Sequence, residues 1–263
     1  MELGPVTIHM YALCILTGII FAVWLGRARY QSFGGDPEDI SEAAAWAIPA
    51  GIVGGRIYHV ITSPEKYFGK NGTPTDAFKI WEGGLGIWGA ISLGAFAALL
   101  YFRTHKTSLN FPYFLDALAP GVVIAQAIGR IGNWFNVELF GSPSTLPWAL
   151  SVPKFDRPSG YLEFETYHPT FLYELIWCLL VAYCLIKLPG KFKGIVKNPG
   201  DLFALYVAGY TLGRLWIEAL RIDEANHIFG VRLNIWVSIM VLTGSVLYLL
   251  KFRANPENNS AAS

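Results

Sequence analysis

Long apolar stretches separated by short polar connections run through most of this chain. Seven of them are long enough to be membrane-spanning helices, because about twenty apolar residues are needed to cross the hydrocarbon core of a bilayer. We predict spans at residues 9–26, 40–61, 83–102, 111–136, 168–188, 202–220 and 233–252. The second span carries Pro49, three glycines and Arg56, and this density of helix breakers predicts a kinked or broken helix.

Two of the connections are too polar to be spans. Residues 63–81 and 139–167 are rich in proline, glycine and aromatic side chains, which suit short amphipathic elements lying on a membrane surface. We expect them to form a small extracytoplasmic head on a single polytopic catalytic domain that covers residues 1–253. Residues 254–263 are expected to be a disordered cytoplasmic tail. The predicted fold class is therefore an all-α integral membrane protein with about seven transmembrane helices.

The distribution of basic residues predicts the orientation of these spans. Half of the twenty lysines and arginines lie close to one set of span ends, namely Arg27, Arg29, Arg103, Lys106, Lys187, Lys191, Lys193, Lys197, Lys251 and Arg253. The opposite connections hold Lys66, Lys70, Lys79, Lys154, Arg157, Arg221 and Arg232, mostly further from the spans or beside acidic residues. Because cytoplasmic loops carry the excess of basic residues, we expect the N-terminus outside and the C-terminus inside.

Composition agrees with this class. Of the 263 residues, 53% are hydrophobic and only 15% are charged, which argues against a soluble domain, and a net charge of +1 gives no basis for a nucleic-acid partner. Cys14, Cys178 and Cys184 lie in apolar segments and are interpreted as buried hydrophobic side chains without a disulfide framework. The N-terminus has no basic region and no small-residue cleavage site, so we expect the first apolar segment to be retained.

The first candidate site is a polar sequence that ends the fourth span. The stretch Gly129–Gly141 brings Arg130, Asn133 and Glu138 to membrane depth or to the membrane surface. Ionisable groups are costly in a bilayer and usually face a bundle interior or a wet cavity. Arg130 and Asn133 are three residues apart and share a helical face, whereas Glu138 is expected just beyond the helix. The structural alternative is a buried ion pair between helices.

The second candidate site is a polar stripe along the sixth span. Tyr210, Arg214, Glu218 and Arg221 are spaced four, four and three residues apart and therefore share one helical face. Arginines from two spans that converge on a cavity would bind a phosphate, since guanidinium grips phosphate oxygens with a bidentate fork. The alternative is that Glu218 only neutralises an arginine, but one acid beside two arginines leaves a positive surplus.

Histidines and tyrosines add weaker candidates. His9 and Tyr11 open the first span, and His168 opens the fifth. A lone histidine in such a place is more often a hydrogen-bonded structural group than a base. No pair of residues has metal-ligand spacing, and no phosphate loop or nucleophile elbow occurs, so we predict no metal and no cofactor.

Together these residues resemble the prolipoprotein diacylglyceryl transferase family, whose members are bacterial inner-membrane enzymes. The resemblance extends from Ile8 to about Asp223, and the order of the motifs is as specific as their content. The five motifs are Gly129–Glu138, Gly209–Arg221, His9-Met10-Tyr11, Gly54-Gly55-Arg56, and His168-Pro169-Thr170 with Tyr173-Glu174. One departure is Trp88, which stands where well-known members have a histidine that is often assigned to the active site.

The resemblance implies transfer of the diacylglyceryl group of phosphatidylglycerol to the lipobox cysteine of a prolipoprotein signal peptide, with release of glycerol 1-phosphate. We assign Arg130 to the lipid phosphate with Asn133 as its hydrogen-bond partner. We assign Arg214 to the phosphate or leaving group. The remaining assigned residues are Tyr210 in the lipid-binding set, Glu218 and Arg221 as residues that orient Arg214, and His9, Tyr11 and Glu138 as alternative candidates for the base.

Two other function classes use the same buried arginines. A transporter or flippase for an anionic lipid predicts flux without a covalent product, and it gains no support here because the chain has no internal repeat. A non-catalytic membrane scaffold predicts lipid binding alone.

Overall fold

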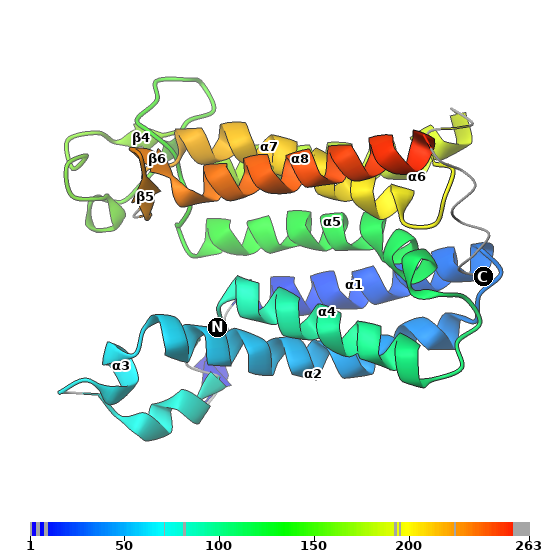
Figure 1. Ribbon diagram of the computed structural model, residues 1–263. Coiled ribbons are helices and arrows are strands. Elements are labelled where there is room, and N and C mark those ends of the chain that lie inside the picture. The colour runs from blue at the N-terminus through cyan, green and yellow to red at the C-terminus, as the bar shows by residue number, and fades with distance from the viewer. Residues whose placement is uncertain are drawn as a thin grey trace. The chain divides into compact units, whose positions relative to one another are not determined.

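The computed structural model describes residues 2–254, except 4–5, 8–9, 71, 81–82, 192–193, 195 and 224, and it is mostly helical (Figure 1). The helices are α1 (Met10–Ser32), α2 (Pro37–Thr62), α3 (Glu65–Phe68), α4 (Ile87–Thr104), α5 (Phe111–Phe135), α6 (Thr170–Lys191), α7 (Asp201–Leu220) and α8 (Leu233–Ala254), with 3-10 turns at Pro74–Phe78 and Lys154–Asp156. Three antiparallel strand pairs complete the fold: β1 (Glu2–Leu3) with β2 (Val6–Thr7), β3 (Leu150–Ser151) with β4 (Thr166–Tyr167), and β5 (His227–Ile228) with β6 (Val231–Arg232).

Every predicted span corresponds to a long helix. Five of these helices are long and apolar enough to cross a membrane, namely α1, α4, α5, α6 and α8. The other two, α2 and α7, occupy the predicted second and sixth spans and carry more charged residues. The chain is therefore a mostly helical, multi-pass membrane protein.

The second predicted span is one continuous helix, so of the two expected alternatives, a kinked or a broken helix, the broken one is wrong. The helix α2 runs from Pro37 to Thr62 with Pro49 inside it. Its glycines serve close packing: a Cβ atom on Gly54 would overlap the carbonyl oxygen of Gly89 in α4, and a Cβ on Gly89 would overlap that of Gly54. Small residues of this kind let two helix backbones approach closely in a membrane.

The chain divides into two compact units. One comprises residues Arg27–Phe114, in which α2 packs along α4. The other comprises Met1–Gly26 together with Leu115–Ser263, and it contains every residue of the site described below.

In the second unit, α6 packs on α7 and α7 packs on α8 (Figure 1). The first part of α1 lies against α5, where Gly18 approaches Ala125 and Gly121 approaches Ala22. A core of small and apolar side chains fills the space between α5, α6 and α7, including Ala119, Val123, Cys178, Ala182, Leu185, Leu202 and Tyr206. This close packing holds the polar ends of α5, α6 and α7 in register.

The segment 139–167 contains the strands β3 and β4 and one 3-10 turn, and no spanning helix. Phe140, Val152 and Tyr167 are buried together beside the β3–β4 pair. The Tyr167 hydroxyl donates hydrogen bonds to the carbonyl oxygens of Tyr161 and Phe164, which fixes the loop around this core. The predicted tail lies mostly outside the described residues, which end at 254.

Candidate functional site

The end of α5 presents Arg130 and Asn133 on one face. The Nη1 of Arg130 donates to Oδ1 of Asn133 at 3.2 Å, which confirms that the two side chains meet across one helical turn. The Nδ2 of Asn133 in turn donates to Oε1 of Glu138 at 2.8 Å. Asn133 is buried, so it links the arginine to the carboxylate inside the protein.

Glu138 lies just beyond α5, as predicted, on a constrained piece of backbone. Its neighbours Val137 and Leu139 have φ angles of 50° and 58°, a region that residues other than glycine rarely adopt. The Glu138 carboxylate also accepts a hydrogen bond from Nδ2 of Asn136 at 3.1 Å. Such conformations persist where surrounding contacts enforce them, and they often occur at functional sites.

Glu174 of α6 is the centre on which two arginines converge. The Nη2 of Arg130 lies 2.5 Å from Glu174 Oε1, and the Nη1 of Arg214 lies 3.0 Å from Glu174 Oε2. The hydroxyl of Tyr210 donates to Oε1 at 3.0 Å. One carboxylate on α6 therefore joins an arginine of α5 to an arginine of α7.

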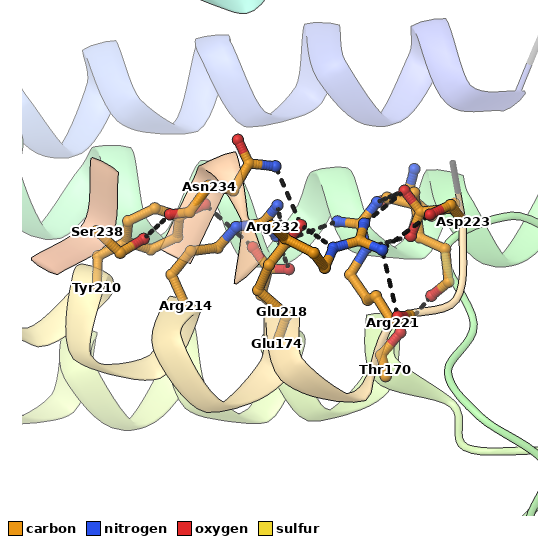
Figure 2. A network of polar contacts seen from close by, with 12 residues as sticks. Thr170, Glu174, Tyr210, Arg214, Glu218, Arg221, Asp223, Arg232, Asn234 and Ser238 are labelled. Carbon is orange, nitrogen blue, oxygen red and sulfur yellow. Dashed lines mark hydrogen bonds and ion pairs between the residues drawn. The ribbon is translucent and has the colours of Figure 1, made fainter. Parts of the chain in front are cut away.

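Glu218 forms a second centre one helical turn beyond Arg214. Its Oε2 lies 2.6 Å from Nη2 of Arg214 and 3.7 Å from Nη1 of Arg221. Its Oε1 accepts from Nε of Arg232 at 2.9 Å and from Nδ2 of Asn234 at 3.0 Å. Figure 2 shows these side chains in a row along α7, from Tyr210 to Asp223. The spacing of the sequence stripe is thus confirmed as a shared face.

Asp223 closes the network after α7. Arg221 donates to it through a fork, Nε to Oδ1 at 2.7 Å and Nη2 to Oδ2 at 2.9 Å, and Arg232 reaches Oδ2 at 3.1 Å. Burial raises the pKa of the Asp223 carboxyl, but hydrogen bonds and charge from Arg221 and Arg232 outweigh this and lower it below its usual value. A cavity of about 750 Å³ lies against this end of the network and is lined in part by Arg221, Asp223 and Arg232.

The arginines are paired but retain free binding capacity. Among the described residues, four guanidiniums (Arg130, Arg214, Arg221 and Arg232) contact three carboxylates (Glu174, Glu218 and Asp223). One positive charge is left over in this group. An arginine has five N–H donors, and the contacts of Arg130 and Arg214 employ only part of them.

Exposure separates the four arginines into two pairs. The side chains of Arg130 and Arg214 are 18% and 16% exposed, whereas those of Arg221 and Arg232 are 8% and 10% exposed and those of the glutamates are 4% or less. Arg130 and Arg214 are therefore the more exposed pair, and the carboxylates between these arginines are almost fully buried.

Comparisons with known proteins give the family of this chain. The family model described as prolipoprotein diacylglyceryl transferase matches residues 1–251. The chain belongs to the prolipoprotein diacylglyceryl transferase family. It is 51% identical over 250 residues to the phosphatidylglycerol–prolipoprotein diacylglyceryl transferase 2 of Streptomyces coelicolor, covering 95% of this chain and 77% of the relative. It is 52% identical over 249 residues to the corresponding transferase of Cutibacterium acnes, covering 95% and 82%.

The other predicted residues of this prolipoprotein diacylglyceryl transferase family member lie as follows. Tyr11 is in the first turn of α1, against Gly132 of α5, one residue from Asn133. His9 lies outside the described residues. The ring nitrogen Nδ1 of His168 is 3.1 Å from the Tyr173 hydroxyl. Trp88 is in the first turn of α4, in the other unit, and is exposed. In the described ranges, no group of three or more histidine, cysteine or acidic residues is placed to hold a metal ion.

Sequence patterns give only weak signals for three members of the network. Glu174 enters the sequence prediction only as part of a motif, although an acid within an apolar span is itself a functional signal. Arg232 and Asp223 resemble ordinary connection residues, because both lie between predicted spans. The partners of Arg232, Glu218 and Asp223, are 14 and 9 residues away along the chain. Only the folding of α8 back onto α7 brings Arg232 to Glu218.

Proposed function

We propose that this chain transfers the diacylglyceryl group of phosphatidylglycerol to the thiol of the lipobox cysteine of a prolipoprotein, in the bacterial plasma (inner) membrane. The observation that carries the proposal is the meeting of Arg130 and Arg214, from two helices, on the single carboxylate of Glu174. The names of the relatives, phosphatidylglycerol–prolipoprotein diacylglyceryl transferases, support the same reaction.

The reaction exchanges one bond for another at the glyceryl carbon. The cysteine sulfur forms a thioether to that carbon while the carbon–oxygen bond to phosphate breaks, and glycerol 1-phosphate leaves. A free cysteine with a pKa of about 8.5 is mostly protonated at neutral pH, so its proton must pass to a base. Positive charge beside the thiol favours the thiolate, and donors aimed at the phosphate stabilise the charge that develops there.

The proposed roles follow the geometry. Arg130, held by Asn133 and Glu174, binds the lipid phosphate with its remaining donors. Arg214, held between Glu174 and Glu218, stabilises the departing phosphate. Tyr210 and Arg221 complete the lipid-binding set by fixing Glu174 and Glu218.

Three groups are candidates for the base: His9, Tyr11 and Glu138. Glu138 is linked to Arg130 through Asn133. Tyr11, in the first turn of α1, lies against Gly132, the residue before Asn133. Replacing each of them singly, as Tyr11→Phe and Glu138→Gln for example, distinguishes them. Loss of the base lowers kcat most strongly at low pH, where the thiol is fully protonated, and spares transfer at high pH.

We further propose that residues 1–253 form one catalytic domain with seven spans, the N-terminus outside and the C-terminus inside. The polar network then lies near the outer leaflet, below a head built from residues 139–167, and the second outer segment covers residues 63–81. The basic residues flanking the spans support this orientation.

The direct test uses purified protein, phosphatidylglycerol and a peptide that contains a lipobox cysteine. A gain in peptide mass equal to one diacylglyceryl group supports the proposal, and a peptide with serine in place of the cysteine should stay unmodified. Lipid movement across a vesicle membrane with an unchanged peptide would instead indicate a transporter, and lipid binding alone would indicate a scaffold.

A further inference from the structure

Arg232 is a buried arginine whose contacts all face the end of α7. It is the last residue of β6 and directly precedes α8. Its Nε donates to Glu218 and its Nη2 to Asp223, while its Nη1 donates to the carbonyl oxygens of Asp223 at 2.8 Å and Arg221 at 3.3 Å. A single guanidinium thus joins the start of α8 to the end of α7.

Asn234 approaches the same carboxylate oxygen from the first turn of α8. Its Nδ2 donates to Glu218 Oε1 at 3.0 Å, beside the Nε of Arg232 at 2.9 Å. Glu218 is fully buried, and among the described residues its Oε2 accepts no hydrogen bond but forms ion pairs with Arg214 and Arg221. With Oε1 held by the α8 residues, Oε2 is directed toward Arg214, 2.6 Å away.

We infer that Arg232 and Asn234 are positioning residues for the proposed transfer, because they hold Glu218 so that its second oxygen fixes the guanidinium of Arg214. The inference rests on the proposed function, in which Arg214 stabilises the departing phosphate. Figure 2 shows Arg232 and Asn234 beside Glu218, with Arg214 further along α7.

Arg214 needs this second support because one carboxylate does not fix a planar group. Glu174 accepts a hydrogen bond from its Nη1 and Glu218 forms an ion pair with its Nη2, so the two carboxylates together restrict the plane of the guanidinium. A fork that binds phosphate depends on that plane. If the Glu218 carboxylate turns toward Arg221 instead, Arg214 keeps its charge, but its guanidinium is no longer held in one orientation.

A tight hairpin delivers Arg232 to this place. His227 pairs with Arg232, and the two-residue turn between the strands has φ angles of 51° at Phe229 and 75° at Gly230. Positive φ at both positions is characteristic of a type I′ turn. The Leu233 amide donates to the Asn226 carbonyl oxygen at 2.8 Å and closes the hairpin against α8.

The test is a double-mutant cycle on the full-length enzyme, using Arg232→Gln, Glu218→Gln and both together. Peptide transfer is followed by mass spectrometry and divided by the amount of folded protein, measured by size exclusion and thermal unfolding. Each single change should lower kcat by about 10–100-fold with little change in the KM for the peptide, because Arg214 is misdirected. The double variant should lose no more than about threefold beyond the worse single variant, because Arg232 acts through Glu218.

Two milder variants keep the test independent of folding. Asn234→Ala removes one hydrogen bond to Glu218 and should lower kcat in the same direction. Gly230→Ala strains the hairpin without touching the network, whereas Gly160→Ala places the same strain in the head loop, where a Cβ also meets nothing within 4 Å. We expect Gly230→Ala to lower kcat and Gly160→Ala to leave it unchanged.

The outcomes distinguish a failure of the positioning role of Arg232 from a failure of the proposed transferase function. Losses that multiply in the double variant, or a kcat of Arg232→Gln equal to wild type in folded protein, would overturn the positioning role while the transferase activity stands. A wild-type enzyme that adds no mass to the peptide would refute the proposed function, and this role with it.

Discussion

At the scale of single residues, Glu174 is the side chain that matters most to the proposed transfer after Arg130 and Arg214. Glu174→Gln keeps the shape of the side chain and removes its charge, so Arg130 and Arg214 lose their shared anchor. We expect kcat/KM to fall by about 100-fold or more, because breaking a buried ion pair leaves the partner charges uncompensated and misplaced. Transfer to a lipobox peptide measures this.

The matched control for that substitution is Glu163→Gln, which removes the same charge from an exposed position of the head loop. It should leave kcat/KM close to that of wild type. A large loss of kcat/KM in Glu163→Gln, or a wild-type kcat/KM in Glu174→Gln, would contradict the role given to Glu174.

Asp223 predicts a pH dependence of stability. Its pKa is lowered in the folded protein by Arg221 and Arg232. The contacts therefore add stability that is complete above the ordinary aspartate pKa of about 3.9 and is lost as the pH falls through the lower folded value. Asp223→Asn should unfold at a lower temperature than wild type at pH 7, and this difference should shrink as the pH falls below about 4. A gap that stays constant with pH would exclude the ionised pair as its cause.

Residue spacing predicts the contacts of this site that lie within one helix, but not those between helices. Separations of three and four residues predict that Arg130 meets Asn133 and that Tyr210 lies beside Arg214, because helical periodicity is a local property. The partners of Arg232 cannot be predicted from spacing, since they depend on the hairpin and on the packing of α8 against α7.

At the scale of elements, the contact between α2 and α4 depends on two glycines. Gly54→Ala introduces a Cβ that overlaps the backbone of Gly89, so we expect a loss of stability of about 1–3 kcal/mol. Thermal unfolding in detergent measures the loss.

The matched control is Gly244→Ala in α8, where a Cβ would meet nothing within 4 Å. Alanine is the better helix former, so this variant should be about 0.5–1 kcal/mol more stable than wild type. Equal stability of the two variants would show that the α2–α4 contact is not close packed.

Helices are the predictable elements of this chain and small strands are not. The ends of α5 and α7 fall within one residue of the predicted spans, because long apolar stretches leave few alternatives in a membrane. The continuity of α2 is not predictable in the same way, since its glycines indicate breaks until the surface of α4 is known. Strand pairs of two residues, such as β5–β6, leave too short a pattern to recognise.

At the scale of the whole molecule, the proposed seven-span topology can be tested with alkaline phosphatase, which is active only when exported. The enzyme inserted at residue 160 should be active, and the enzyme fused after residue 263 should be inactive, because the head is proposed to be outside and the C-terminus inside. Activity at both sites, or at neither, would mean that an even number of spans separates them, in place of the proposed three.

The proposed transfer is tested most directly by the intact mass of a lipobox peptide after incubation with phosphatidylglycerol and wild-type, Arg130→Ala or Arg214→Ala protein. Each protein is first confirmed to be folded and membrane-inserted. We expect a gain of one diacylglyceryl group with wild type and an unmodified peptide with either variant. A peptide left unmodified by the wild-type protein, or modified by both variants as fully as by wild type, would contradict the proposed transfer through Arg130 and Arg214.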